Sequence, residues 1–296
     1  MDYVTRKAYA KINLGLDVLR RRPDGYHEVK MIMQTVGIYD VLTFRKRKMM
    51  GDFPDITISL DKEELPCDKN NLIYKAAELI MQAYEIKEGV DITLNKNIPI
   101  AAGMAGGSTD AAAVFHGFKE LFGLSMSLED MKDMGVKIGA DVPYCIMGGT
   151  ALSEGIGEIL TPLPASPKAC LLIAKPEISV STKFVYENLH ADRLEYHPDI
   201  DGMVDALQNG DLKGITDRMG NVLEIVTVKE YPVIARIKEE MLKGGAENAL
   251  MSGSGPTVFG IFREKEAAGK CSEVIKELGL AKQIFVTEFI QADEVI

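Results

Sequence analysis

Residues 99–113 read Pro-Ile-Ala-Ala-Gly-Met-Ala-Gly-Gly-Ser-Thr-Asp-Ala-Ala-Ala, a run of small residues that leads directly into a helix-forming segment. Its three glycines permit positive φ angles and let a ligand approach the backbone closely. Ser108 or Thr109 is expected to cap the helix, and Asp110 with the alanines favours its first turn. Backbone N–H groups then point out of a partially positive helix end, which binds phosphate. The stretch therefore predicts a site for nucleotide phosphates.

Two familiar phosphate loops do not fit this stretch. A Walker A loop has Lys after its last glycine, whereas Ser108 follows Gly107 here. A dinucleotide loop needs Gly-x-Gly-x-x-Gly after the first strand of a βαβ unit, and the glycine spacing differs. The alternative that stays open is a tight strand-to-helix turn that holds no ligand.

The bulk composition narrows the class of protein. With 296 residues, 46% of them apolar, the chain has enough core for one large domain or two intimate ones. A formal net charge of −10 disfavours a broad basic face, so we expect no nucleic-acid partner. Neither a signal-like start nor an apolar run of about 20 residues occurs, which predicts a cytoplasmic protein without membrane contact. The four cysteines are scattered and read as reduced thiols.

Hydrophobic periodicity predicts a β-rich start followed by mixed α and β segments, hence an α+β fold. Residues 7–18 place six apolar side chains on one face of a half-buried strand. Strands at 29–36, 41–44 and 56–60 would complete a β-meander. Further helices are expected at about 71–84, 108–122, 182–190, 200–208, 230–243 and 264–278, with another from a capping box at Ser127, and further strands at 90–94, 169–174, 257–262 and 282–289.

Proline content indicates where the chain divides. Residues 161–167 hold three prolines in seven positions, which is typical of a linker rather than of a helix or a central strand. We therefore expect an N-terminal domain over 1–161 and a C-terminal domain over 162–296.

Two segments far apart in the sequence supply residues for phosphoryl transfer. Lys11 and Asn13 are two positions apart on the polar face of the first strand, so they lie side by side. Asp141 lies in Gly-Ala-Asp-Val-Pro, which reads as a loop between a helix and a strand. An Asp can accept a hydroxyl proton, while a Lys neutralises charge on the moving phosphoryl group. Taken singly, each side chain is more often structural or solvated.

Two further features admit both a functional and an ordinary interpretation. Residues 252–256, Ser-Gly-Ser-Gly-Pro, lie between apolar strands and are expected to form a hairpin turn, with closure over phosphates or substrate as the alternative. Tyr26, His27 and Tyr186 are candidates for stacking on a flat base, with ordinary packing as the alternative.

The chain resembles the GHMP kinase superfamily in three places, and the resemblance spans essentially its whole length. The similar stretches are 8–14, 99–111 and 250–259, in the order that the superfamily has them. Three further stretches resemble one branch, which acts on a cytidine-diphosphate sugar alcohol in the non-mevalonate route to isoprenoids. They are Arg22-Pro-Asp-Gly-Tyr-His-Glu28, Gly139-Ala-Asp-Val-Pro143 and Glu154-Gly-Ile-Gly-Glu158.

The resemblance implies a two-domain fold and an activity. The N-terminal domain would resemble ribosomal protein S5 domain 2, and the C-terminal domain would be a ferredoxin-like α/β sandwich. The enzyme would use ATP, with Mg²⁺, to phosphorylate the 2-hydroxyl of that sugar alcohol, as a monomer or homodimer. No metal ligand is identified in this sequence.

The resemblance also implies roles for particular residues. Asp141 would act as base on the hydroxyl, with Lys11 as its electrostatic partner. Asn13, Tyr26, His27 and Tyr186 would bind the substrate, with His27 reading the base. Residues 70–73 are a candidate adenine pocket. The ATP-phosphate loop would comprise Pro99, Ile100, Ala101, Ala102, Gly103, Met104, Ala105, Gly106, Gly107, Ser108 and Thr109.

This sequence departs from the superfamily's commonest loop at two positions. Met104 replaces Leu, and Thr109 replaces Ser, and both changes keep size or hydroxyl character. Two alternatives stay open. One is a superfamily kinase for homoserine, mevalonate or phosphomevalonate, and the other is a regulator that binds nucleotide or sugar without catalysis.

Overall fold

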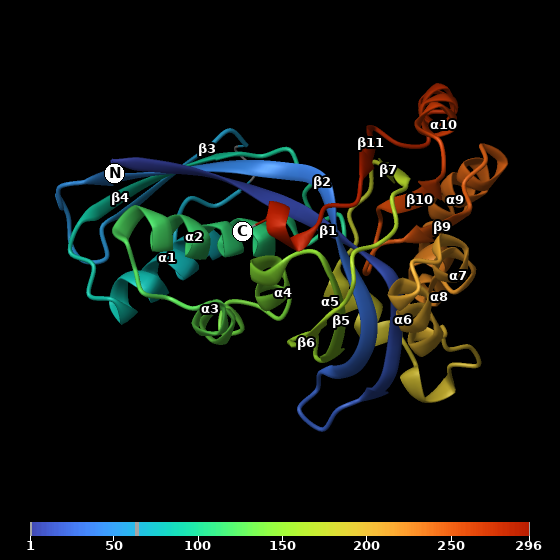
Figure 1. The fold of residues 1–296 in the computed structure, drawn as a ribbon, viewed down its shortest axis with the longest axis horizontal. Coiled ribbons are helices and arrows are strands. Elements are labelled where there is room, and N and C mark those ends of the chain that lie inside the picture. Colours follow the sequence, from blue (N-terminus) through green and yellow to red (C-terminus); the bar gives the residue numbers. More distant parts are fainter. Residues whose placement is uncertain (1, 63–64, 296) are drawn as a thin grey trace.

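The computed structural model describes residues 2–62 and 65–295, which form two sheets that are both covered by helices (Figure 1). The first sheet contains β1 (Tyr3–Arg21), β2 (His27–Arg47), β3 (Ile56–Leu60), β4 (Gly89–Asn95), β5 (Thr150–Gly155), β6 (Ile159–Pro162) and β8 (Gly220–Asn221). Its strand order is β3-β4-β2-β1-β8, with β5 paired to β2 and β6 paired to β5. Its helices are α1 (Leu72–Ala83), α2 (Gly106–Phe122), α3 (Leu128–Gly135) and α4 (Val142–Met147).

The second sheet contains β7 (Cys170–Lys175), β9 (Asn248–Met251), β10 (Val258–Phe262) and β11 (Gln283–Glu288), in the order β11-β7-β10-β9. The second half of the chain also forms α5 (Thr182–Asn188), α6 (Ile200–Gln208), α7 (Leu212–Asp217), α8 (Glu224–Glu230), α9 (Val233–Lys243) and α10 (Lys265–Glu277). The sequence did not predict α4, α7 or α8, because a helix of six or seven residues is too short to show a clear period.

The strand predicted over 7–18 is confirmed, but its apolar side chains do not share one face. The pairing of β1 with β2 shifts register on both sides of the strand's middle, as β-bulges do. Ala8 and Leu16 therefore pack in the first core cluster, whereas Ala10, Ile12 and Leu14 pack in the second. This second cluster also holds residues of β7 and β10, so the middle of β1 joins the two sheets.

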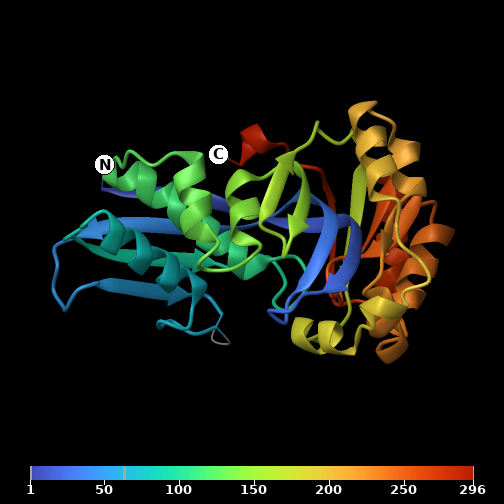
Figure 2. The same cartoon turned by 90° about the horizontal axis from the view of Figure 1, so that it is seen from below.

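The opening of the chain is not a simple meander. The segments expected as separate strands at 29–36 and 41–44 form the single strand β2. Strand β3 pairs parallel with β4, and β4 pairs antiparallel with β2. Figure 2 shows the long hairpin of β1 and β2 curving between the two helix-covered parts of the molecule, where its tip can line a site.

The two halves of the chain are tied together at several places. Strand β6 ends at Pro162, so the proposed division after 161 falls one residue inside it. Strand β8 comes from the second half of the sequence but pairs parallel with β1. Near the C-terminus, Phe289 bridges to Val36 of β2. A division at 161/162 therefore leaves three parts of the C-terminal side in contact with the first sheet. They are Pro162 at the end of β6, strand β8, and Phe289.

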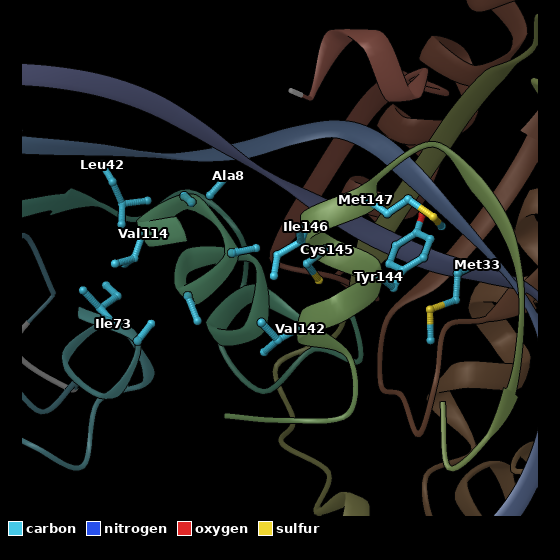
Figure 3. Packing of buried hydrophobic residues seen from close by; sticks show 14 of the residues in the cluster. Ala8, Met33, Leu42, Ile73, Val114, Val142, Tyr144, Cys145, Ile146 and Met147 are labelled. Carbon is cyan, nitrogen blue, oxygen red and sulfur yellow. The ribbon is translucent and has the colours of Figure 1, made fainter. Parts of the chain in front are cut away.

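Helix α4 positions the segment that carries Asp141. Figure 3 shows Val142 and Ile146 in the space between α4 and α2, and both are fully buried. Tyr144 is also buried, and its hydroxyl donates to the carbonyl oxygen of Gly149 at 2.7 Å. Burial of each large apolar side chain contributes about 1.5–3 kcal/mol, so this short helix is held by packing rather than by its own length. Among residues 2–62 and 65–295, no helix is both long and apolar enough to cross a bilayer.

Candidate active site

A cavity of about 1100 Å³ opens between the two halves of the molecule. Its walls come from the β1–β2 hairpin, the segment 99–107, the start of α4, helix α5 and the β9–β10 turn. The volume lies slightly above the roughly 300–1,000 Å³ that is typical of pockets for one drug-sized ligand.

The small-residue stretch forms one wall of this cavity. Ala101 and Ala105 adopt positive φ angles of 50° and 54°, which non-glycine residues rarely take. Ala105 is the N-cap of α2 and provides no side-chain hydrogen bond, so the prediction that Ser108 or Thr109 caps this helix is wrong. Ser108 is instead the third residue of the helix. Helix α2 therefore begins at the cavity wall with its first N–H groups free of any side-chain cap, which is the arrangement that holds phosphate.

The β9–β10 turn packs against the segment 99–107. Residues 252–256 form the predicted hairpin turn between two antiparallel strands. The hydroxyl of Ser252 donates to the carbonyl oxygen of Gly103 at 2.9 Å, and a Cβ on Gly103 would lie 2.2 Å from the carbonyl oxygen of Ser252. Gly253 and Ser254 line the cavity. The turn therefore supports the backbone of the segment 99–107 as well as reversing the chain.

Lys11 and Asp141 lie next to each other in the cavity. The Lys11 Nζ atom is 3.7 Å from Asp141 Oδ2 and donates to Asn13 Oδ1 at 2.9 Å. The lysine side chain is buried, whereas that of Asp141 is 33% exposed. The prediction that Asp141 lies in a loop between a helix and a strand is wrong, because this residue is the N-cap of α4 and a helix begins directly after it. A buried ammonium beside an accessible carboxylate suits proton acceptance with charge compensation.

The tip of the β1–β2 hairpin brings aromatic groups to the other end of the cavity. The rings of His27 and Tyr186 lie 5.1 Å apart between centroids at an angle of 38°. Tyr26 lines the cavity and is 60% exposed. Burial, with a smaller contribution from Arg21, lowers the pKa of His27, so its imidazole is neutral at pH 7. Burial, reinforced by Asp141, raises the pKa of Tyr186, which keeps its phenol neutral.

The cavity brings together most residues that the sequence proposed, with two corrections. The side chain of Met104 packs in the second core cluster, and the hydroxyl of Thr109 donates to the carbonyl oxygen of Tyr9. Neither residue lines the cavity. The proposed residues that line it are Lys11, Asn13, Tyr26, His27, Pro99, Ile100, Ala101, Ala102, Gly103, Ala105, Gly106, Gly107, Ser108, Asp141 and Tyr186.

The cavity also has wall residues to which the sequence analysis gave no binding role. Lys96 follows β4 and donates to Asp110 Oδ2 at 2.7 Å and to Asp40 of β2. Asp110 is buried in this cluster and is the fifth residue of α2, so it does not lie in the first helical turn where the sequence analysis placed it. The sequence carries no signal for the place of Lys96 in the cavity wall, because a lone Lys between a strand and a loop belongs to no motif.

The candidate adenine residues 70–73 lie only partly in the cavity wall. The first three line the cavity, and Ile73 is buried in the core.

The described residues do not build a metal cage by themselves. Within 2–62 and 65–295, no three side chains of His, Cys, Asp or Glu are grouped so that they could hold an ion.

Comparisons with known proteins agree with this fold and cavity. The sequence profiles of the GHMP kinases N terminal domain and the GHMP kinases C terminal domain match residues 71–149 and 203–279. The chain belongs to the GHMP kinase family. The predicted two-domain α+β GHMP kinase fold is thereby confirmed.

Within this family, two relatives from different bacteria share one name. The chain is 52% identical over 295 residues to 4-diphosphocytidyl-2-C-methyl-D-erythritol kinase of Lachnoclostridium phytofermentans, with 100% of both chains covered. It is 48% identical to the protein of the same name from Clostridium perfringens, over 97% of this chain and 98% of the relative. The prediction of a small-molecule kinase is confirmed by these relatives.

Solved structures agree with the sequence relatives. A crystal structure of 4-(cytidine 5'-diphospho)-2C-methyl-D-erythritol kinase superposes with a TM-score of 0.82 at 29% identity, covering 97% of this chain and 99% of that one. Homoserine kinase from Cytophaga hutchinsonii superposes with a TM-score of 0.79 at 21% identity, over 99% of this chain and 96% of that one. The second likeness concerns the fold alone.

Proposed function

We propose that this enzyme transfers the γ-phosphoryl group of ATP to the 2-hydroxyl of 4-diphosphocytidyl-2-C-methyl-D-erythritol, in the non-mevalonate isoprenoid pathway. The observation that carries the proposal is the Lys11–Asp141 pair, with its 3.7 Å separation, in the same cavity as the open N-terminus of α2. The relatives' shared name supports the choice of substrate.

The ATP end of the cavity is the loop 99–109 with the start of α2. Free backbone N–H groups and the partial positive charge of the helix end attract the β- and γ-phosphates. The backbone N–H of Lys11 donates to the carbonyl oxygen of Met104 at 3.2 Å, so the loop is tied to the strand that carries the lysine. Mg²⁺ bound to the phosphate oxygens would neutralise part of their charge.

The acceptor end is the carboxylate of Asp141. The substrate oxygen attacks the γ-phosphorus, its proton passes to Asp141, and the bond between the γ-phosphorus and the ADP oxygen breaks. Lys11 stabilises the negative charge of both the carboxylate and the transferred group. This step needs the hydroxyl about 3 Å from Asp141, which its partial exposure permits.

The cytidine end is formed by Tyr26, His27 and Tyr186. A neutral imidazole has one donor and one acceptor nitrogen, which suits the edge of a cytosine ring. The two tyrosine rings supply apolar faces on which the base stacks. Asn13 holds Lys11 in place and lines the cavity, within the region proposed for the substrate hydroxyls.

An assay with purified protein tests the proposal. ATP and the cytidyl substrate should yield ADP and a new phosphomonoester visible by phosphorus NMR. Asp141→Asn should lower kcat by at least about 100-fold while an ATP analogue still binds with wild-type affinity. Near wild-type turnover by this variant would remove the general-base role.

A substrate panel separates the alternatives. The cytidyl substrate should outperform homoserine, mevalonate, phosphomevalonate and 2-C-methyl-D-erythritol 4-phosphate, because only it can occupy the aromatic end of the cavity. Equal rates with and without the cytidyl group would favour another superfamily kinase. Nucleotide binding without transfer to any of these alcohols would favour a regulator.

A further inference from the structure

A buried cluster of one amine and two carboxyls lies against the start of α2. Lys96 donates to Asp40 of β2 and, at 2.7 Å, to Asp110 of α2. All three side chains are at most 5% exposed. A Cβ on Gly106, the first residue of α2, would lie 3.0 Å from the Lys96 Nζ atom. The cluster is therefore in contact with the backbone that is proposed to hold the phosphates.

The two carboxyls of the cluster are not equivalent. Asp40 Oδ1 accepts from the backbone N–H groups of Asn97 at 2.6 Å and Ile98 at 2.8 Å, and its Oδ2 accepts from Lys96. Asp110 accepts from Lys96 through Oδ2, while its buried Oδ1 has no hydrogen-bond partner in the described part of the chain. A buried carboxylate needs donors on both oxygens to remain ionised at low cost. Among the described residues, Asp110 has a donor on one oxygen only, whereas Asp40 has donors on both.

The surroundings of Asp110 point the same way. Burial, reinforced by the charge of Asp40 and opposed by Lys96, raises the pKa of Asp110 well above its usual range. The thiol of Cys145 on α4 is also close enough to feel the charge of Asp110. Burial also raises the pKa of Cys145, so the thiol stays protonated and adds no charge.

We propose that Asp110 is an un-ionised carboxylic acid in the working enzyme and that its neutrality is required for tight nucleotide binding. The positive charge of Lys96 and the negative charge of Asp40 then cancel, and the cluster beside the start of α2 has no net charge. An ionised Asp110 would place an uncompensated negative charge on the second turn of the helix that receives the phosphates. Asp110 is thus a positioning residue for the nucleotide, an inference that rests on the nucleotide site proposed above.

Calorimetric titration with a non-hydrolysable ATP analogue tests this role in the wild type and in Asp110→Asn. Asn has nearly the same shape as the un-ionised acid and can still accept from Lys96. At neutral pH we expect the two proteins to bind within about twofold of each other. At alkaline pH the wild type should bind about tenfold more weakly than the variant, because charge has appeared near the phosphates. Asp91→Asn is the matched control and should follow the wild type, because it alters a carboxylate of β4 that pairs with Arg47 of β2.

Infrared spectroscopy provides a readout that does not need nucleotide. The carbonyl stretch of an un-ionised carboxylic acid should be present in the wild type and in Asp91→Asn at neutral pH, absent from Asp110→Asn, and lost from the wild type as pH rises. If Asp110→Asn fails to fold, the pH titration of the wild-type band still decides the protonation state.

Two results would overturn the inference. One is tighter nucleotide binding by Asp110→Asn than by the wild type at neutral pH, and the other is the absence of the infrared band from the wild type. A wild type that shows the band but binds no nucleotide at any pH would overturn the proposed nucleotide site and the positioning role, and would leave the un-ionised acid established.

Discussion

Ser252 in the β9–β10 turn donates a hydrogen bond from its hydroxyl to the carbonyl oxygen of Gly103 in the phosphate loop, at 2.9 Å. The two residues are 149 positions apart in the chain and belong to different halves of the molecule. The two glycine-rich stretches of the sequence are therefore one structural unit, in which the turn of the second sheet fixes the backbone of the loop.

This contact predicts that Gly103 tolerates no side chain. Gly103→Ala would place a Cβ 2.2 Å from the carbonyl oxygen of Ser252, at a φ of +71°. We expect the KM for ATP to rise at least about tenfold, because the loop must move away from the turn. Gly123→Ala is the matched control, since Gly123 has a φ of +65° and no atom within 4 Å of its added Cβ. A control that impairs ATP binding equally would show that φ strain, not the contact, is responsible.

The position of Lys11 should depend on Asn13. Asn13→Ala removes the acceptor that holds the Lys11 Nζ atom at 2.9 Å. We expect kcat to fall about 10- to 100-fold with little change in the affinity for an ATP analogue, because misplacing a charged group disturbs the reacting geometry. Met31→Leu, which removes the sulfur that the Asn13 amide contacts at 3.2 Å, should change kcat less than about threefold. Equal effects of the two variants would mean that Asn13 acts through packing alone.

His27 should make cytidyl-substrate binding sensitive to acid. Its pKa is lowered, so the imidazole is neutral at pH 7 and takes up a proton only below the usual histidine range. We expect the KM for the cytidyl substrate to be constant from pH 7 down to that lowered pKa and to rise below it, while the KM for ATP is unaffected by this titration. His27→Gln keeps one donor and one acceptor but has no such titration. If the KM of His27→Gln for the cytidyl substrate still rises at low pH as in the wild type, a group other than His27 causes that rise.

The free energy of unfolding should also depend on the protonation of His27. Because the folded protein binds the His27 proton less tightly than the unfolded chain does, the contribution of this group to stability is present above the usual histidine pKa. That contribution is lost as pH falls through the lowered pKa. Urea unfolding of the wild type and His27→Gln across this range measures it as a difference between two curves.

The buried cluster under the phosphate loop should be important for stability. Asp40→Ala leaves the Lys96 ammonium without its ionised partner and frees the two loop N–H groups that Asp40 accepts. We expect the free energy of unfolding to fall by about 3–5 kcal/mol, measured by urea denaturation. Glu266→Ala breaks an exposed pair with Lys270 and should change it by less than about 1 kcal/mol. If both variants lose a similar free energy of unfolding, leaving the buried Lys96 ammonium without its partner is not the reason for the loss.

Local sequence patterns predicted much of the fold because they report on short-range geometry. The capping box at Ser127 is present as predicted, because its hydrogen bonds join residues three positions apart. The hairpin around 252–256 formed as expected for the same reason. Strand β1 was longer than predicted, and its bulges were missed, because a bulge depends on the partner strand and not on the period of one segment.

The chain's own sequence determined the small-residue loop, the polar pair on β1 and the carboxylate at 141, since each is a matter of residue type within a few positions. Tertiary structure alone decided that Ala105 is the N-cap of α2 and that the hydroxyl of Thr109 bonds to the backbone of β1. It also decided that Asp110 joins Lys96 and a β2 residue 56 positions before that lysine. Hydrogen bonds and buried charges depend on which groups meet in space, and segments brought together by folding leave no periodic trace in the order of residues.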